Sequence, residues 1–122
     1  MTQGADGEVV SIGRLELRPE EFLASVDGQP LPLTVRELQL LTALARRRDR
    51  VVSRQELYSV VWQRPFRREE RSVDVYVRRL RNKLERALPE WVFIHTHYGF
   101  GYRLSPQPTR VSQVFHTPAT DR

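Results

Sequence analysis

The chain has 122 residues, the size of one domain with short tails, and a formal net charge of +5. It has no cysteine, which excludes disulfides and thiolate chemistry, and no apolar run approaches the roughly 20 residues that a membrane span needs. The polar, acidic start MTQGADGE does not resemble a signal peptide, so we expect a cytoplasmic protein with no membrane partner.

The positive charge is concentrated in one segment. Residues 64–86 hold 9 basic and 4 acidic side chains, whereas residues 1–63 hold 8 basic and 9 acidic ones. Such a concentration of charge on one element is typical of proteins that bind polyanions.

Short strand-like runs dominate the first third of the chain. Residues 1–8 are rich in glycine and polar side chains, and we expect them to be disordered. Strand-like runs follow at residues 9–12, 14–17, 22–26 and 30–33, and Asp27-Gly28 between the last two is a strong hairpin signal. The pattern predicts an antiparallel sheet of three or four strands.

Two capping boxes predict the starts of the first two helices. Thr34-x-x-Glu37 precedes an apolar face, and Ser53-x-x-Glu56 opens a shorter helix. The first helix ends in three arginines, residues 46–48. We interpret them as cations that suit a helix C-terminus, with a nucleic-acid patch as the alternative.

A charged loop, from Gln63 to Glu70, joins the second helix to the third. Pro65 disfavours helix at the residue before it. Phe66 is an apolar side chain in this loop, and we expect it to plug the local core, with a partner contact as the alternative.

The third predicted helix, residues 71–86, has two distinct faces. Four apolar residues recur at helical spacing and predict a buried stripe: Val73, Val77, Leu80 and Leu84. The opposite side carries Arg71, Val75, Arg78, Arg79 and Asn82. Arginines that can fork onto guanine or phosphate, beside one small apolar group, suit a DNA recognition helix. A solvated amphipathic helix fits this segment equally well.

Two further strands, residues 91–97 and 102–104, flank the glycine turn Tyr98-Gly99-Phe100-Gly101. The aperiodic Ser, Pro, Gln and Thr composition after Leu104 predicts a flexible tail over residues 105–122. The predicted organisation is therefore one α+β domain over residues 9–104, with a sheet of three to four strands, three helices and a C-terminal β-hairpin. Two helices before a basic third helix and a hairpin describe a winged helix-turn-helix.

Other chemistries find little support. His95-x-His97 places two imidazoles on one face of a strand, but no third ligand is near in sequence, so we expect no metal. Gly99-x-Gly101 lacks the third glycine of a dinucleotide fingerprint, and we expect no cofactor. We find no nucleophile–base constellation, and therefore expect no enzyme.

Several motifs occur together in the order of a known family. They are Leu33-Thr34-x-x-Glu37-Leu38-x-Leu40-Leu41, Val52-Ser53-Arg54-x-x-Leu57, Val61-Trp62, Arg71-Ser72-Val73-Asp74-Val75, Arg78-x-Leu80-Arg81-x-Lys83-Leu84, Ile94-x-Thr96 and Gly99-x-Gly101-Tyr102. With these motifs the chain resembles the OmpR/PhoB-type DNA-binding effector domains of bacterial response regulators. The resemblance covers residues 9–105.

The resemblance implies that the third helix enters the major groove of duplex DNA. It implies a base contact for Arg79, a thymine-methyl contact for Val75, and phosphate contacts for other arginines. Asp74 is expected to accept from a cytosine amino group or to orient a neighbouring arginine. The implied DNA-binding residues are Arg71, Ser72, Asp74, Val75, Arg78, Arg79, Arg81, Asn82, Tyr98 and Arg103.

The chain departs from the family pattern in the hairpin and in the loop. Many relatives have valine and arginine where this chain has His97 and Tyr98. Tyr98 cannot supply the arginine's charge in the minor groove, although Arg103 can substitute electrostatically. Gln63 replaces a common glycine. In some members this loop touches RNA polymerase, which implies a contact through Gln63, Arg64, Phe66, Arg67 and Arg68.

The resemblance further implies a transcription regulator that binds direct repeats as a dimer, under a receiver domain phosphorylated by a sensor kinase. A receiver needs about as many residues as this chain has, so none fits here. The linker-like start over residues 2–7 leads us to favour an excised effector half over a free-standing effector domain. The rival from another class is a winged-helix protein-interaction module, which would use the loop and the sheet face. Charge concentrated on one helix argues against it, because protein interfaces deplete charge at their centre.

Overall fold

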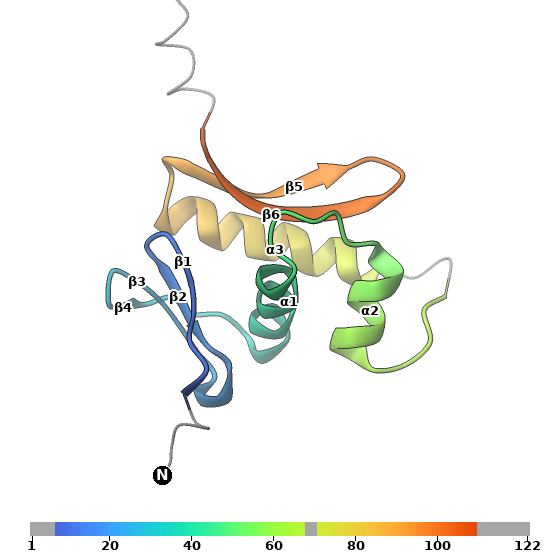
Figure 1. The fold of residues 1–122 in the computed structure, drawn as a ribbon, viewed down its shortest axis with the longest axis horizontal. Helices are drawn as coiled ribbons and strands as arrows, with labels where there is room; N and C mark the ends of the chain where they lie inside the picture. Colours follow the sequence, from blue (N-terminus) through green and yellow to red (C-terminus); the bar gives the residue numbers. More distant parts are fainter. Residues whose placement is uncertain (1–6, 68–70, 110–122) are drawn as a thin grey trace, which may run out of the picture.

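The computed structural model describes residues 7–67 and 71–109. Within them an antiparallel sheet precedes three helices and a hairpin, which confirms the predicted α+β winged-helix architecture (Figure 1). The elements are β1 (Val10–Ile12), β2 (Leu15–Arg18), the 3-10 turn η2 (Pro19–Glu21), β3 (Leu23–Val26), β4 (Gln29–Pro30), α1 (Val35–Arg46), α2 (Arg54–Trp62), α3 (Ser72–Ala87), β5 (Trp91–His97) and β6 (Gly101–Pro108). None of the helices in these parts of the chain has the length and apolar composition that crossing a membrane requires.

The four strands of the first sheet pair in chain order. Asp27 and Gly28 form the two-residue turn between β3 and β4, and both have positive φ, 52° and 83°, as a type I′ hairpin turn requires. The fourth strand, expected over residues 30–33, instead ends at Pro30. Proline has no N–H, so Pro30 and Pro32 cannot donate to the ladder, and beyond Pro30 the N–H of Leu31 donates to the carbonyl of Ala24 at 2.8 Å.

Side-chain caps begin the first two helices as expected. Thr34 accepts from the backbone N–H of Glu37, whose carboxylate accepts from the N–H of Thr34, which completes a capping box. Ser53 accepts from the N–H of Glu56, but the Glu56 carboxylate instead binds Arg47 and Arg50. The second cap therefore ties α2 to the end of α1.

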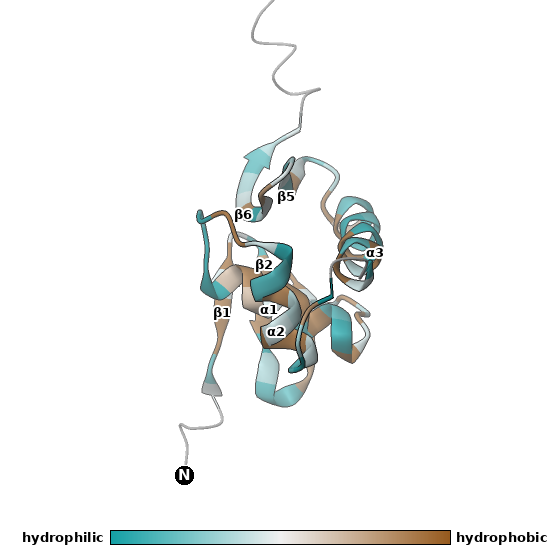
Figure 2. Ribbon diagram, turned by 90° about the vertical axis from the view of Figure 1, so that its right-hand side faces the viewer, coloured by the Kyte–Doolittle hydropathy of each residue, from teal (hydrophilic) through white to brown (hydrophobic). Residues whose placement is uncertain are grey.

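Helix α1 is the centre of the core. It contacts β1, β6, α2 and α3, and Figure 1 shows the sheet on one side of it and α2 on the other. Its residues Leu40, Leu41 and Leu44 have no exposed surface. Figure 2 shows hydrophobic colour on α1 and the strands facing it, and hydrophilic colour over much of α3. Helix α3 therefore rests on the core with one side and presents polar residues on the other.

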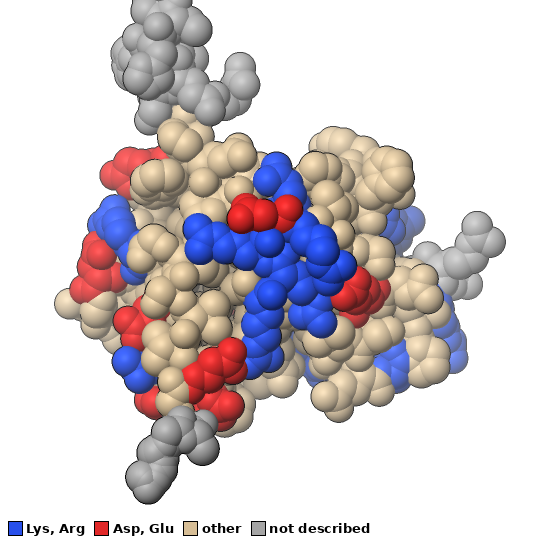
Figure 3. Space-filling view, viewed as in Figure 1, with Lys and Arg blue, Asp and Glu red and all other residues tan. Residues whose placement is uncertain are grey.

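Basic and acidic side chains gather together at the C-terminal end of α1 (Figure 3). Arg46 pairs with Glu8, and Arg47 and Arg50 pair with Glu56. The Arg47 guanidinium also donates to the carbonyl of Ala43, 3.0 Å away, which is one of the last carbonyls of the helix. The bond to Ala43 matches the helix C-terminus interpretation for Arg47, and Arg46 is instead paired with Glu8.

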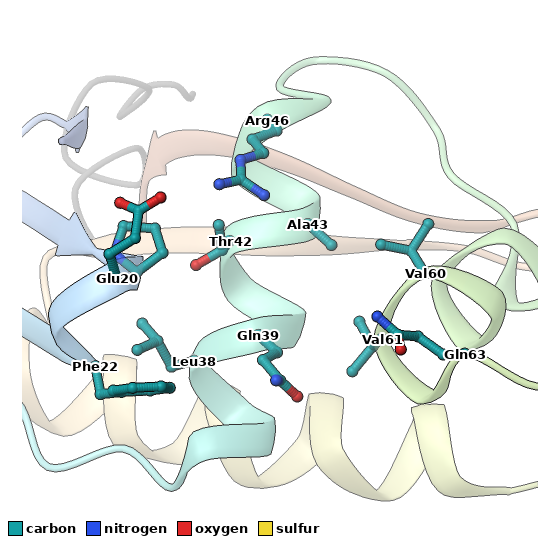
Figure 4. Close-up of a pocket in the computed structure, with 11 residues that line it drawn as sticks. Glu20, Phe22, Leu38, Gln39, Thr42, Ala43, Arg46, Val60, Val61 and Gln63 are labelled. Carbon is teal, nitrogen blue, oxygen red and sulfur yellow. The ribbon is translucent and has the colours of Figure 1, made fainter. Parts of the chain in front are cut away.

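A groove of about 410 Å³ lies between η2, α1 and α2. Phe22 and Leu38 line one side of it and Val60 and Val61 the other (Figure 4). None of its lining residues belongs to α3 or to the β5–β6 hairpin. The groove is therefore separate from the surface that the sequence singles out.

Candidate nucleic-acid interface

The two faces of α3 lie as the periodicity predicts. Val73, Val77, Leu80 and Leu84 are at most 3% exposed. On the opposite side Val75 is half-buried, and the exposed side chains are those of Arg71, Arg78, Arg79 and Asn82. The helix thus presents cations and an amide around one small apolar group.

One flank of α3 is fastened to α1 by an ion pair. Lys83 Nζ lies 2.6 Å from Glu37 Oε1 and donates to the carbonyl oxygen of Pro32 at 3.0 Å. Burial raises the pKa of Glu37, but hydrogen bonds from Lys83 and from the Thr34 N–H outweigh it, so the pKa lies below its ordinary value. The Glu37 side chain is only 3% exposed and ionised at neutral pH, so Lys83 compensates a buried charge.

The other flank of α3 is fastened to the hairpin by Arg81. Its Nε and Nη2 donate to the carbonyl oxygen of Ile94, and Nη2 also donates to the Thr96 hydroxyl. The guanidinium lies over the Tyr102 ring, 5.6 Å from its centroid. The Arg81 side chain is therefore engaged within the domain, and fewer of its N–H groups remain for the phosphate contact expected from the resemblance.

Asp74 joins three elements near the start of α3. Its Oδ1 accepts from the Tyr102 hydroxyl of β6 and lies 3.4 Å from Nε of Arg54, the first residue of α2. Burial and then the hydrogen bond to Asp74 raise the pKa of Tyr102 to about 12, so the hydroxyl remains a donor at neutral pH. Asp74 was expected either to accept from a cytosine amino group or to orient a neighbouring arginine. This geometry agrees with the second role, and the arginine is Arg54 of α2.

Arg54 is a candidate site residue that sequence reasoning gave no role. A cavity of about 200 Å³ is lined by residues from α2, α3 and the hairpin: Arg54, Asp74, Thr96, His97, Tyr98, Gly99, Gly101 and Tyr102. Arg54 follows the Ser53 cap, and only the packing of α2 against α3 brings it beside the first turn of α3. The sequence feature that could have indicated Arg54 is its position as a basic residue directly after the Ser53 helix cap.

The hairpin tip presents two exposed aromatic side chains. Tyr98 is 88% exposed and Phe100 is 75% exposed. Phe100 N–H donates to the carbonyl of His97, and Gly99 has φ 85°, as the third position of a type II turn requires. Arg103 lies two residues after the start of β6, where its Nε donates to His97 Nε2 at 3.0 Å. The tip of the hairpin therefore presents aromatic side chains, and Arg103 of β6 is hydrogen-bonded to His97 of β5.

The loop after α2 combines an anchor with exposed cations. Phe66 packs on the core and meets the Tyr58 ring edge-on at 5.5 Å, which confirms the core plug. Gln63, Arg64 and Arg67 are exposed, and Arg64 lies over Tyr58 at 5.6 Å. Gln63 has φ 60°, a left-handed conformation that glycine adopts more easily than other residues. Arg68, the last of the expected contact residues, lies outside the described residues.

The two histidines of β5 bind protein groups. His95 Nε2 donates to the carbonyl oxygen of Ser105 at 2.7 Å, and His97 accepts from Arg103. In residues 7–67 and 71–109 no group of three or more His, Cys, Asp or Glu side chains is arranged to hold a metal ion.

Comparison with known proteins gives consistent matches. Residues 28–104 match the protein family described as Transcriptional regulatory protein, C terminal. The chain is 36% identical over 101 residues to the sensory transduction protein RegX3 of Mycolicibacterium smegmatis, covering 83% of this chain and 44% of RegX3. It is 37% identical over 99 residues to the alkaline phosphatase synthesis transcriptional regulatory protein PhoP of Bacillus subtilis, covering 81% and 41%. The chain thus spans less than half the length of these relatives.

Solved structures show the same similarity. The DNA-binding domain of CpxR from E. coli matches with a TM-score of 0.71 and 31% identity, over 80% of this chain and 96% of that domain. The Klebsiella pneumoniae RstA DNA-binding domain, solved in complex with the RstA box, matches with a TM-score of 0.73 and 27% identity, over 83% and 100%. The similarity therefore covers complete DNA-binding domains.

Proposed function

The chain belongs to the OmpR/PhoB-type family of C-terminal DNA-binding domains of transcriptional regulators, and from this premise we propose that the outward face of α3 binds a specific duplex DNA sequence. One observation carries the proposal: α3 is held to the core by a buried stripe and two flanking contacts, while Arg71, Arg78 and Arg79 remain exposed. Such a helix fits the major groove, where arginine forks onto guanine.

Different residues of the surface take different roles. Arg79 contacts a base edge and Val75 a thymine methyl, because both lie on the outward face. Arg71 and Arg78 grip phosphates and so position Arg79. Asp74 orients Arg54 toward the DNA backbone. The remaining expected contacts are Ser72 and Asn82 from α3, Arg81 through its Nη1, and Tyr98 and Arg103 from the hairpin.

Replacing Arg79 by alanine tests base recognition. We expect a loss of about 1–3 kcal/mol on the preferred duplex and a relaxed preference at one base position, because a bidentate base contact is lost. Duplexes bound by each variant would be selected from a random pool and sequenced. Arg78→Ala is the matched control, since it removes an equal charge from the same helix but should leave the sequence preference intact. An unchanged preference in Arg79→Ala would rule out the base-contact role.

We further propose that the chain is the effector part of a two-component response regulator. The aligned residues cover only 44% of RegX3 and 41% of PhoP, and RegX3 is named a sensory transduction protein. In this arrangement a receiver domain, phosphorylated by a sensor kinase, controls cytoplasmic effector domains that bind direct repeats as dimers. The spacing of repeats in the selected duplexes distinguishes dimeric from monomeric binding.

The loop after α2 is proposed to contact RNA polymerase. Phe66 anchors it, while Gln63, Arg64 and Arg67 are exposed and accessible to a partner, with Arg68 next in the chain. The function proposed for the chain is binding without catalysis.

A further inference from the structure

Arg79 lies over an aromatic ring of its own helix. Its guanidinium carbon is 5.1 Å from the centroid of Tyr76, one helical turn before it. Residues at i and i+3 are neighbours on a helix surface, so this contact needs no distortion of the backbone. A guanidinium within about 6 Å of a ring centroid is attracted by the negative face of the ring.

The Tyr76 ring is itself held in place by α2. It meets Trp62 edge-to-face, with the centroids 5.5 Å apart and the planes at 72°. Trp62 stacks on Tyr58 at 5.0 Å and 8°, and Arg36 lies over the Trp62 ring at 5.0 Å. Arg36 also donates to the carbonyl oxygen of Val61 at 2.8 Å, which fixes it relative to α2. Tyr76 therefore belongs to a packed aromatic cluster and is not a freely rotating surface side chain.

Contact with a ring uses the face of the guanidinium and leaves its edge available. All five N–H donors of arginine lie in the plane of the group, so a cation held over a ring can still fork onto a guanine edge. Arg81 shows the opposite arrangement, because its in-plane donors bind Ile94 and Thr96. Of these two arginines, Arg79 is the one whose hydrogen-bonding edge the protein leaves exposed.

We propose that Tyr76 is a positioning residue that sets the base specificity of Arg79, with Trp62 holding the Tyr76 ring. The inference rests on the proposed function and adds a specificity-determining residue to it. An arginine side chain carries large rotamer entropy, and a ring that restricts it before binding lowers the entropy lost on contact with a base. Tyr76 acts on base discrimination through Arg79 and makes no base contact itself.

The test compares Tyr76→Leu, which removes the ring, with Tyr76→Phe, which keeps it. The probe is the duplex selected by the unaltered 122-residue chain, together with versions changed at each base position. Tyr76→Leu is expected to reduce discrimination about two- to fivefold at the position that Arg79 contacts, the factor that an exposed cation–π contact provides. Tyr76→Phe should keep full discrimination, and binding to an unrelated duplex should not change in either variant.

A double-mutant cycle separates positioning from stability. In an Arg79→Ala background Tyr76→Leu should cause no further loss of discrimination, because the residue it positions is absent. A loss that persists without Arg79, or that is equal on all duplexes, overturns the proposal, as does an equal loss in Tyr76→Phe. Tyr76→Met serves as a second ring-free variant if the leucine variant does not fold. An unaltered chain that selects no sequence at all would overturn the proposed function itself, and this inference with it.

Discussion

Lys83 and Glu37 form the most deeply buried ion pair among the described residues. The Glu37 side chain is 3% exposed, and Lys83 also bonds the carbonyl of Pro32, so this pair links α3, α1 and the segment before α1. Removing one partner of such a pair leaves an uncompensated charge, which is more costly than the pair itself is stabilising. The orientation of α3 on the core therefore depends on a side chain at the edge of its polar face.

Lys83→Met should lower the free energy of unfolding by about 3 kcal/mol at neutral pH, because the Glu37 carboxylate loses its partner. The folded protein lowers the pKa of Glu37 from its ordinary 4.5, so this stabilisation is complete above pH 4.5 and is lost as the pH falls through the lower folded value. The difference between the two proteins should therefore shrink in acid.

Urea unfolding at a series of pH values measures this difference. Glu37→Gln is the control, since glutamine still accepts from the Thr34 N–H but does not ionise. In the Glu37→Gln background the cost of Lys83→Met should therefore not depend on pH. A cost of Lys83→Met that is the same at pH 3.5 and pH 7 would contradict the ion-pair explanation.

Besides its contacts with Arg81 and Asp74 of α3, the hairpin pairs with Val52, which lies just before α2. Val52 N–H donates to the carbonyl of Tyr102 at 2.7 Å, and Tyr102 N–H donates back to Val52 at 2.9 Å. Gly101 makes this approach possible, since a Cβ there would lie 2.0 Å from the Val52 carbonyl oxygen. The same glycine has φ 147°, a backbone conformation that other residues rarely adopt.

Gly101→Ala should therefore separate the hairpin from α2 and lower the free energy of unfolding by at least about 2 kcal/mol, from overlap and backbone strain together. Gly99→Ala is the matched control, because Gly99 also has positive φ, 85°, but a Cβ there meets nothing within 4 Å. It should cost only about 1–2 kcal/mol. Denaturant unfolding of both variants measures the difference, and equal costs would show that the close approach to Val52 is unimportant.

At the scale of the whole molecule, the distribution of charge matters more than its sum. Residues 64–86 carry a balance of +5, equal to the net charge of the chain. Arg46 and Arg47 at the end of α1 are paired with Glu8 and Glu56, whereas Arg78 and Arg79 of α3 are exposed. The field toward a polyanion therefore comes chiefly from α3 and the loop before it.

Arg78→Ala should weaken binding to all duplexes alike and make the plot of log affinity against log salt concentration shallower by about 1, because one phosphate contact is lost. Arg18→Ala removes an equal charge from the four-stranded sheet and should leave the slope unchanged. Affinities measured by titration from low to moderate salt provide the test. Equal slopes for Arg78→Ala and the unaltered chain would exclude a phosphate contact.

Local chemistry was enough to predict the elements and their faces. The buried stripe of α3, the Asp27-Gly28 turn and the Thr34 cap were predicted because each depends on residues within one or two turns of chain. The last strand of the four-stranded sheet was predicted at residues 30–33 but lies at Gln29–Pro30. Two prolines in this segment limit which N–H groups can pair. Strand β6 continues past Leu104 to Pro108, so residues 105–108, which were predicted to belong to a flexible tail, are part of the hairpin. The domain bounds themselves remain a prediction.

That one basic amphipathic helix has a buried and an outward face follows from the sequence, because period and charge are properties of a single segment. What each polar side chain on that helix contacts depends on the packing of distant segments. Arg81, Asp74 and Lys83 bind partners that are 13 to 51 positions away in the chain, and no local pattern specifies such contacts. The contact of Arg79 with Tyr76 lies within α3, but Tyr76 is held by Trp62 because the packing of α2 against α3 places those two rings together.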